Sequence, residues 1–273
     1  MRHKNLITLL FVIFPVISIA QNYIHFSTGT SDFIEFYITV YGEEEVEIIL
    51  ENVSILSTDS LIQELTSKAL AANFLGNWAK LTGESERFHQ VSLIGLLYYS
   101  ELIRRNEIWR DVYYYGGEIK KSNGYYKSAI QDYTKALNNR PYKLIMPDYE
   151  IIGMRGEAKF LLEDYYGAIN DLTIGIDWTK SNLSVKSDEF QKLNLHLFYI
   201  KRGRSYLLIN KLNDALENFN ELIEFSSDCG ECYFLRGITY ISMGRISKGC
   251  IDLSTAGELE YDRAYEAIDE FCK

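Results

Sequence analysis

Four cysteines are the residues in this chain whose type and spacing could carry chemistry. Cys229 and Cys232 form a C-x-x-C directly before an apolar, aromatic run in SSDCGECYFLRG, and Cys250 and Cys272 follow. A C-x-x-C can be a redox centre, half of a metal site or a structural disulfide. The choice depends on the compartment of the protein and on the elements that hold the pair.

No other chemical motif stands beside the cysteines. The sequence contains no H-E-x-x-H, G-x-S-x-G, Walker-type or G-x-G-x-x-G pattern. Beyond the N-terminal leader, His25, His89 and His196 lack the spacing of metal ligands. We therefore expect a protein that is not an enzyme and that has neither a metal site nor a cofactor.

The N-terminus has the features of a secretory signal peptide. Arg2 and Lys4 give a basic start, Leu6 to Ile19 is apolar, and Ala20 ends a small-residue cleavage site. We expect residues 1–20 to be removed and the mature chain to be exported, either periplasmic or secreted. The apolar run is too short for a comfortable membrane span, and no later stretch is long and apolar enough to form one.

The charge of the chain argues against nucleic acid as a partner. The formal net charge is -10. Loss of Arg2 and Lys4 with the leader would make it -12, from -10 less two positive charges. Such a chain repels a phosphate backbone.

The second half of the chain contains a repeat. In four segments a Gly is followed twelve residues later by a small residue, and four residues further by a large apolar one. Small residues let two helices approach closely, and large ones fill the space beside them. The three positions are Gly117, Ala129 and Tyr133; Gly156, Ala168 and Leu172; Gly203, Ala215 and Phe219; Gly237, Gly249 and Leu253.

These segments resemble the tetratricopeptide repeat (TPR) of exported bacterial proteins, a family of stacked helical hairpins. The bulky residue that opens the pattern is present as Tyr113, Ile152, Tyr199 and Tyr233, while the closing Pro survives only as Pro141. The resemblance predicts an all-α, TPR-like helical-hairpin solenoid. Turns between the two helices are predicted at Asn123-Gly124, Glu163-Asp164, Asn210-Lys211 and Gly244.

Further segments flank the four repeats. We expect a degenerate TPR-like helical pair at 59–109, four repeats at 110–262 with two inserted connections, and a capping helix at 263–273. Residues 21–58 form an N-terminal segment of uncertain structure. On the cap, Ala264, Ile268 and Phe271 are predicted to face inwards.

Arginines before three of the glycines allow two interpretations. Arg155, Arg202 and Arg236 could form a row of anion sites. They could also pair with the Asp or Asn that precedes each large apolar residue of the second helix. We favour structural pairing, because both partners recur with the repeat.

The TPR resemblance implies that a protein or peptide partner binds a concave groove lined by first helices. Carried over position by position, the groove is acidic and aromatic at one end and apolar at the other, which would suit a basic and apolar partner. The alternative is that the chain's own N-terminal segment or cap covers the apolar end. The predicted groove residues are Asp111, Tyr114, Glu118, Lys121, Glu157, Phe160, Leu197, Ile200, Arg204, Leu207, Phe234, Ile238 and Ile241.

The repeat also suggests how the cysteines pair. Cys250 opens the second helix of the last copy, and it lies ~14 Å along that helix from the turn that precedes the cap. Cys272 lies ~15 Å along the returning cap, so the two cysteines should meet as a disulfide. For Cys229 and Cys232 a local disulfide or two semi-exposed thiols is the leading interpretation, with a redox role as the minority one.

The sequence thus predicts a non-catalytic protein-interaction scaffold of the cell envelope or secreted space. The alternative function is a redox-active TPR protein that uses the Cys229/Cys232 pair.

Overall fold

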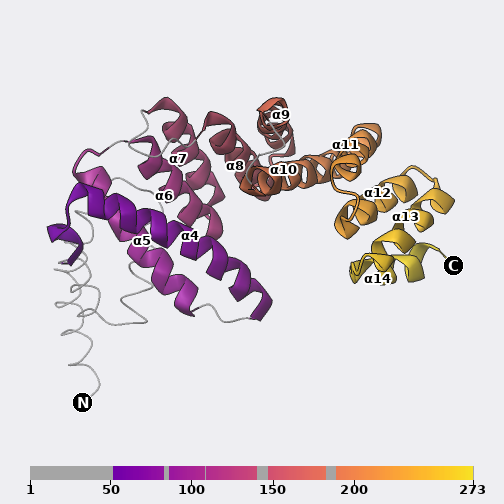
Figure 1. Cartoon of the computed structure of the whole chain (residues 1–273), viewed down its shortest axis with the longest axis horizontal. Helices are drawn as coiled ribbons and strands as arrows, with labels where there is room; N and C mark the ends of the chain where they lie inside the picture. Colours follow the sequence, from indigo (N-terminus) through magenta and orange to yellow (C-terminus); the bar gives the residue numbers. More distant parts are fainter. Residues whose placement is uncertain (1–51, 83–85, 108, 140–146, 183–188, 273) are drawn as a thin grey trace, which may run out of the picture. The chain divides into compact units, whose positions relative to one another are not determined.

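The structure is a computed structural model that describes residues 52–82, 86–107, 109–139, 147–182 and 189–272 (Figure 1). Within these ranges every regular element is a helix, and no strand occurs. The chain divides into two compact units, 1–146 and 147–273. The predicted signal peptide and the predicted segment up to residue 51 lie outside the described residues.

The first unit is built from two antiparallel helical hairpins. The helix α4 pairs with α5, α6 pairs with α7, and α4 also packs against α6. A short helical stretch at 52–55 precedes α4. The bounds are Thr58–Thr82 for α4, Glu86–Arg104 for α5, Arg110–Ser122 for α6 and Tyr126–Asn138 for α7.

The second unit continues the pattern with three hairpins and a final helix. Each helix packs against the next along the chain, and α10 packs against α8 and α12. The predicted all-α class with helical hairpins and a capping helix is confirmed. The bounds are Asp148–Leu161 for α8, Tyr165–Asn182 for α9, Glu189–Leu208 for α10, Leu212–Phe225 for α11, Gly230–Ser242 for α12, Ile246–Glu258 for α13 and Arg263–Phe271 for α14.

The small and large residues of the repeat pack as the spacing predicts. A Cβ added at Gly117 would lie 2.9 Å from Tyr133, and one added at Gly156 would lie 2.9 Å from Leu172. Both large side chains are fully buried. The glycines therefore keep the two helices of each hairpin close enough for the large side chain to pack against backbone.

One turn residue in each repeat has a left-handed backbone. It lies seven residues after the repeat's first Gly, for example at 244 − 237 = 7, and its φ is between 58° and 84°. A left-handed residue ends a helix by turning the chain away while its amide group still bonds back to the helix. The four residues are Gly124, Glu163, Asn210 and Gly244.

Charged side chains join the helices inside each hairpin. Arg155 donates two hydrogen bonds to Asp171, of 2.7 and 3.0 Å, and Arg236 donates two to Asp252, of 2.7 and 2.8 Å. Arg202 donates to the Asn218 side chain, at 2.8 Å. The arginine row therefore has the structural role that the sequence favoured. The first repeat has Gly116 at the Arg position, and there Lys120, three residues after Gly117, supplies the cation, with its Nζ 2.7 Å from Asp132.

The final helix covers the end of the last hairpin. Its residues Ala264 and Ala267 are buried against the hairpin, and the Tyr265 hydroxyl donates a 3.0 Å hydrogen bond to the carbonyl of Gly257. Phe271 is 37% exposed, so its predicted inward position is wrong. The buried face of α14 is narrower than predicted, because the small side chains of Ala264 and Ala267 let α14 lie close to α13.

Candidate functional site

The predicted groove begins on α6, and the structure corrects that part. Asp111, Tyr114 and Glu118 are buried, while Lys121 is half-buried. Glu118 accepts a hydrogen bond from the Tyr133 hydroxyl, and burial raises the pKa of Asp111. Asp111, Tyr114 and Glu118 cannot line an open groove, because they are buried where α6 packs against α4 and α7. The predicted acidic end is therefore part of the interior of the first unit.

In the second unit the predicted groove residues of α8 and α10 meet. Glu157 lies 3.6 Å from the Nζ of Lys201, and Phe160 lies beneath two cations. The Lys201 ammonium is 5.2 Å and the Arg204 guanidinium 5.4 Å from the centre of the Phe160 ring. Cations at this distance are attracted to the face of an aromatic ring. The surface here carries two positive groups and one carboxylate.

Apart from Arg204, the predicted groove residues of α10 and α12 are apolar. Leu197 and Leu207 on α10 are not fully buried, while Ile200 is 5% exposed. On α12, Ile238 and Ile241 are half-buried. The two rows lie one repeat apart, at 238 − 204 = 34 and 241 − 207 = 34, so the packed helices present them side by side.

The cap covers one end of this apolar surface. Phe234 of α12 is 8% exposed, its ring centre lies 5.1 Å from that of Tyr261, and the Arg263 guanidinium lies 5.3 Å from it. The alternative of a self-covered groove therefore applies to Phe234. The half-buried residues Leu207, Ile238 and Ile241, with Arg204, form what we call the inner face of the second unit.

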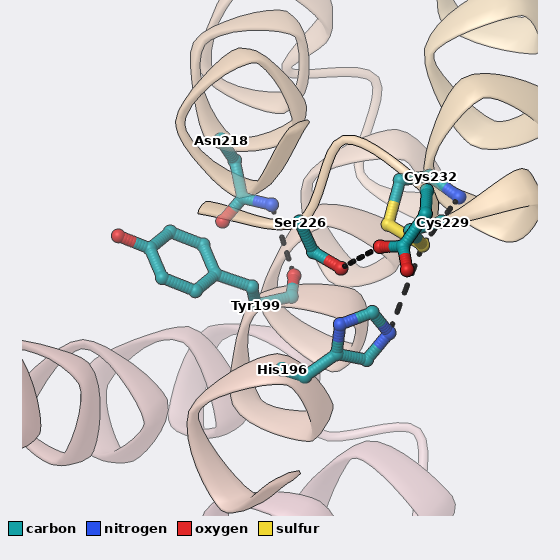
Figure 2. The surroundings of a disulfide bond; sticks show 7 residues. His196, Tyr199, Asn218, Ser226, Cys229 and Cys232 are labelled. Carbon is teal, nitrogen blue, oxygen red and sulfur yellow. Dashed lines mark hydrogen bonds between the residues drawn. A yellow bond between two sulfur atoms is a disulfide. The ribbon is translucent and has the colours of Figure 1, made fainter. Parts of the chain in front are cut away.

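The C-x-x-C pair lies at the start of α12. Cys229 is the N-cap residue, and its Sγ accepts a 3.1 Å hydrogen bond from the backbone amide of Cys232. The two cysteines are joined as a disulfide, with their Cα atoms 5.3 Å apart (Figure 2). Cys229 is half-buried and Cys232 is fully buried. Reagents in solution therefore reach the pair through Cys229.

A histidine from the neighbouring repeat completes this cluster. The Nε2 of His196, on α10, lies 3.7 Å from Cys229 Sγ, and Figure 2 shows the ring turned towards the disulfide. Burial lowers the pKa of His196, against the opposing charges of Glu231 and Asp228. Burial therefore favours the neutral form of the imidazole.

Sequence motifs alone did not find His196. Its separation from Cys229 is 229 − 196 = 33 residues, which matches no short metal or redox motif. This separation of 33 residues is close to the repeat period of 34 residues between Gly203 and Gly237. Residues one period apart stack in neighbouring repeats, and this signal could have linked His196 to the C-x-x-C.

The other two cysteines lie together at the end of the chain. Cys250 on α13 and Cys272 after α14 are joined as a disulfide, with Cα atoms 5.7 Å apart. This geometry agrees with the predicted pairing, and oxidation in solution stays a prediction. The described residues contain no free cysteine.

No protein-family model matches the chain. No curated protein matches it either. Solved structures do match. A crystal structure of MamA is 17% identical with a TM-score of 0.53, over 67% of this chain and 97% of that one. YrrB, titled a TPR protein with an unusual peptide-binding site, is 18% identical with a TM-score of 0.53, over 78% and 98%. The chain has a TPR-type fold.

A third solved structure matches a similar share of this chain. A fragment of MamA from Desulfovibrio magneticus RS-1 is 15% identical with a TM-score of 0.51, over 71% of this chain and 96% of that one. At these identities the likeness is one of fold. None of the described helices has the length and apolar character that a membrane span requires.

Proposed function

We propose that this TPR-type protein is a non-catalytic scaffold that binds a protein or peptide partner on the inner face of its second unit. The observation that carries the proposal is the row of half-buried apolar side chains at Leu207, Ile238 and Ile241. Positions that stay in contact with water could have been polar at little cost to packing. A partner that buried them would gain about 25 cal/mol for each Å² of apolar surface.

The charges beside this row indicate the chemistry of the partner. Lys201 and Arg204 lie over the Phe160 ring, and Glu157 is the carboxylate that pairs with Lys201. The acidic groups that suggested a basic partner, Asp111 and Glu118, are buried. We therefore propose a peptide segment that combines apolar side chains with an acidic group. The peptide-binding site named for YrrB makes a peptide a reasonable class of ligand.

Export is part of the same proposal. It is supported by the signal-peptide pattern of residues 1–20 and by two cysteine pairs of the kind that oxidising compartments favour. Expression in the native cell, followed by fractionation and N-terminal sequencing, tests it. We expect a mature chain that begins at Gln21 and lies outside the cytoplasm. A cytoplasmic chain that keeps residues 1–20 would contradict export.

The binding face is tested by selecting peptides from a displayed random library with the oxidised protein. We expect the selected peptides to share two or more apolar residues and an Asp or Glu. The affinity of one such peptide is then measured by fluorescence anisotropy for the wild type and for the double variant Leu207→Glu/Ile238→Glu. The variant should bind about tenfold or more weakly, because charges replace the apolar contacts.

Ile251→Glu is the matched control. This residue is 67% exposed and lies on the second helix α13, away from the inner face. We expect this control to leave the peptide affinity unchanged. By contrast, Arg204→Glu should weaken the binding of acidic peptides more than the binding of neutral ones. Equal binding by the wild type and the double variant, with matching circular dichroism, would place the binding surface elsewhere.

Thiol–disulfide exchange is a second candidate function, favoured by the environment of Cys229. Its sulfur accepts the Cys232 amide at the N-terminus of α12 and lies beside His196. A helix N-terminus stabilises a thiolate, and an imidazole beside the sulfur can take up the thiol proton. Equilibration with glutathione mixtures measures the reduction potential of the pair. A strongly reducing, inert disulfide would exclude the exchange function.

A further inference from the structure

His196, Cys229 and Cys232 form a cluster that the scaffold function does not use. In the part of the chain that the structure describes, this is the one group of three metal-ligating side chains whose ligand atoms all lie within 4.8 Å of one another. Two of the three are held by the start of α12 and the third by α10, which packs against α12. The three ligands are therefore positioned by two helices that pack against each other.

The spacing suits a zinc ion. With Zn–S of about 2.3 Å, Zn–N of about 2.0 Å and a tetrahedral angle, a thiolate sulfur and an imidazole nitrogen on one Zn²⁺ lie about 3.5 Å apart. The observed distance from Cys229 Sγ to His196 Nε2 is 3.7 Å. Breaking the disulfide frees Cys232 Sγ to move away from Cys229, and a C-x-x-C is the usual spacing for two thiolates on one Zn²⁺.

We propose that reduction of the Cys229–Cys232 disulfide opens a zinc site made of Cys229, Cys232 and His196. The oxidised protein has no such site, because both sulfur atoms are consumed in the disulfide. The metal reaches it from the half-buried side formed by Cys229 and His196. Three protein ligands leave one coordination position for water.

The chemistry balances with a thiol as reductant. Two thiols of the reductant give up two electrons and two protons to the Cys229–Cys232 bond and become a disulfide, while the cysteines become two thiols. Zn²⁺ then binds both sulfur atoms and the neutral imidazole, and the two thiol protons leave to solvent. Oxidation by a disulfide reverses the sequence and releases the ion.

The surrounding charges favour a cation at this place. Asp228 and Glu231 directly precede the two cysteines in the sequence, so each thiolate has a carboxylate next to it along the chain. Neither carboxylate needs to move into contact with the metal, because their field acts through space. Cys250 and Cys272 pair with each other between α13 and the end of α14 and do not contribute ligands.

The test uses the variant Cys250→Ser/Cys272→Ser, in which Cys229 and Cys232 are the remaining cysteines. The protein is reduced with a thiol, freed of reductant without air, and titrated with Co²⁺ and then Zn²⁺. We expect one equivalent of Co²⁺ to produce the intense absorption of a tetrahedral cobalt thiolate, and Zn²⁺ to remove it. The oxidised protein should show neither change.

Variants then separate the proposed site from simple thiol binding. His196→Gln should lower the affinity for Zn²⁺ by at least about tenfold, measured in competition with a chelating dye. Cys229→Ser should abolish the cobalt absorption. Leu193→Gln, at a position on the same helix that is 64% exposed, is the control and should bind as the parent does. An unchanged affinity in His196→Gln would overturn the proposed site.

A measurement on the wild-type protein guards against misfolding of the variants. Reduced wild-type protein is loaded with Zn²⁺ and treated briefly with an alkylating reagent. Mass spectrometry should show Cys229 and Cys232 protected and Cys250 and Cys272 modified. Equal modification of all four cysteines, with and without Zn²⁺, would overturn the proposal. Neither result depends on whether the inner face binds a peptide.

Discussion

At the scale of single residues, Gly249 is the position where the last repeat differs from the others. The other three copies have Ala129, Ala168 and Ala215 there. A Cβ at Gly249 would lie 2.8 Å from the backbone carbonyl of Gly237 and would also meet Ile241. The helices α12 and α13 therefore approach more closely than their spacing with alanine would allow.

We predict that Gly249→Ala, the residue common to the other repeats, destabilises the protein. Alanine in a helix normally gains about 1 kcal/mol over glycine, but a clash with backbone costs about 1–3 kcal/mol and cannot be relieved by a side-chain rotation. A net loss of up to about 2 kcal/mol should appear in urea denaturation. Gly257→Ala is the control, because the nearest neighbour of its Cβ would be the exposed Tyr265 side chain, at 3.3 Å. A stabilised Gly249→Ala would contradict the close approach.

Glu101 is one of the buried carboxylates of the first unit. It accepts hydrogen bonds from Arg104 and Arg105, of 2.7 and 2.6 Å, and Arg105 also donates to the carbonyl of Leu56, at 2.6 Å. Burial alone would raise the pKa of Glu101, but the two arginines outweigh it, and the pKa lies below its ordinary value. The group ties the end of α5 to the segment before α4.

This predicts a contribution to stability that is lost in acid. Because the pKa is lower in the folded state, the contribution is present above the unfolded value of about 4.3 and disappears as the pH falls through the folded pKa. We expect Glu101→Gln to lower the melting temperature at pH 7, with a difference that shrinks below roughly pH 4. A difference that stayed constant across this acid range would show that the substituted amide acts through packing instead of charge.

At the scale of elements, the four turns between first and second helices use one backbone geometry with different residues. Gly124 and Gly244 adopt it at no steric cost, whereas Glu163 and Asn210 adopt it with φ of 66° and 58°. A left-handed residue other than Gly costs about 1–2 kcal/mol, least for Asn. The second repeat therefore has a strained turn between α8 and α9.

We predict that Glu163→Gly stabilises the protein by about 0.5–1 kcal/mol, since relief of the left-handed strain exceeds the added freedom of the unfolded chain. Asn210→Gly should gain less, because Asn tolerates this geometry. Urea midpoints of the two variants provide the comparison. A loss of stability in Glu163→Gly would mean that its side chain has a role that the turn geometry does not reveal.

Helix pairs and turns could be predicted from the sequence because both depend on local spacing. The Gly and Ala positions locate the contact between paired helices, and the turns follow at a fixed distance. The covered face of α6 could not be predicted in this way. Tyr114 and Glu118 lie on a face that a groove would expose, but both are buried, and both contact Tyr133 of α7. Such long-range packing leaves no periodic trace in α6 itself.

At the scale of the whole molecule, each repeat contacts mainly its neighbours, so stability is a sum of local contributions. The Cys250–Cys272 disulfide then acts on the last hairpin and its cap. We predict that Cys250→Ser/Cys272→Ser destabilises this end by about 2–4 kcal/mol. Hydrogen exchange should accelerate in α13 and α14 and stay unchanged in α4 to α7. Uniform acceleration over the chain would contradict local coupling.

Contacts between neighbouring repeats also explain why only the two cysteines of the cluster, and not His196, could be predicted from a motif. The C-x-x-C is visible as a motif, whereas His196 joins it across one repeat period. The extent of the inner face could not be predicted either. Phe234 is covered because the chain turns back beyond α13 and places Tyr261 against its ring. Contacts between repeats follow from the period once the repeats are aligned, but coverage by a terminal element does not.

The disulfide at the C-terminus also makes residues 250–272 a covalent ring. A protease that cuts the exposed turn at Glu260, between α13 and α14, would leave both products on one molecule. The cleaved protein would migrate as an intact chain on a non-reducing gel and release its C-terminal fragment only after reduction. Without reduction, a tag placed after Lys273 would therefore report full-length protein even when the chain had been cut.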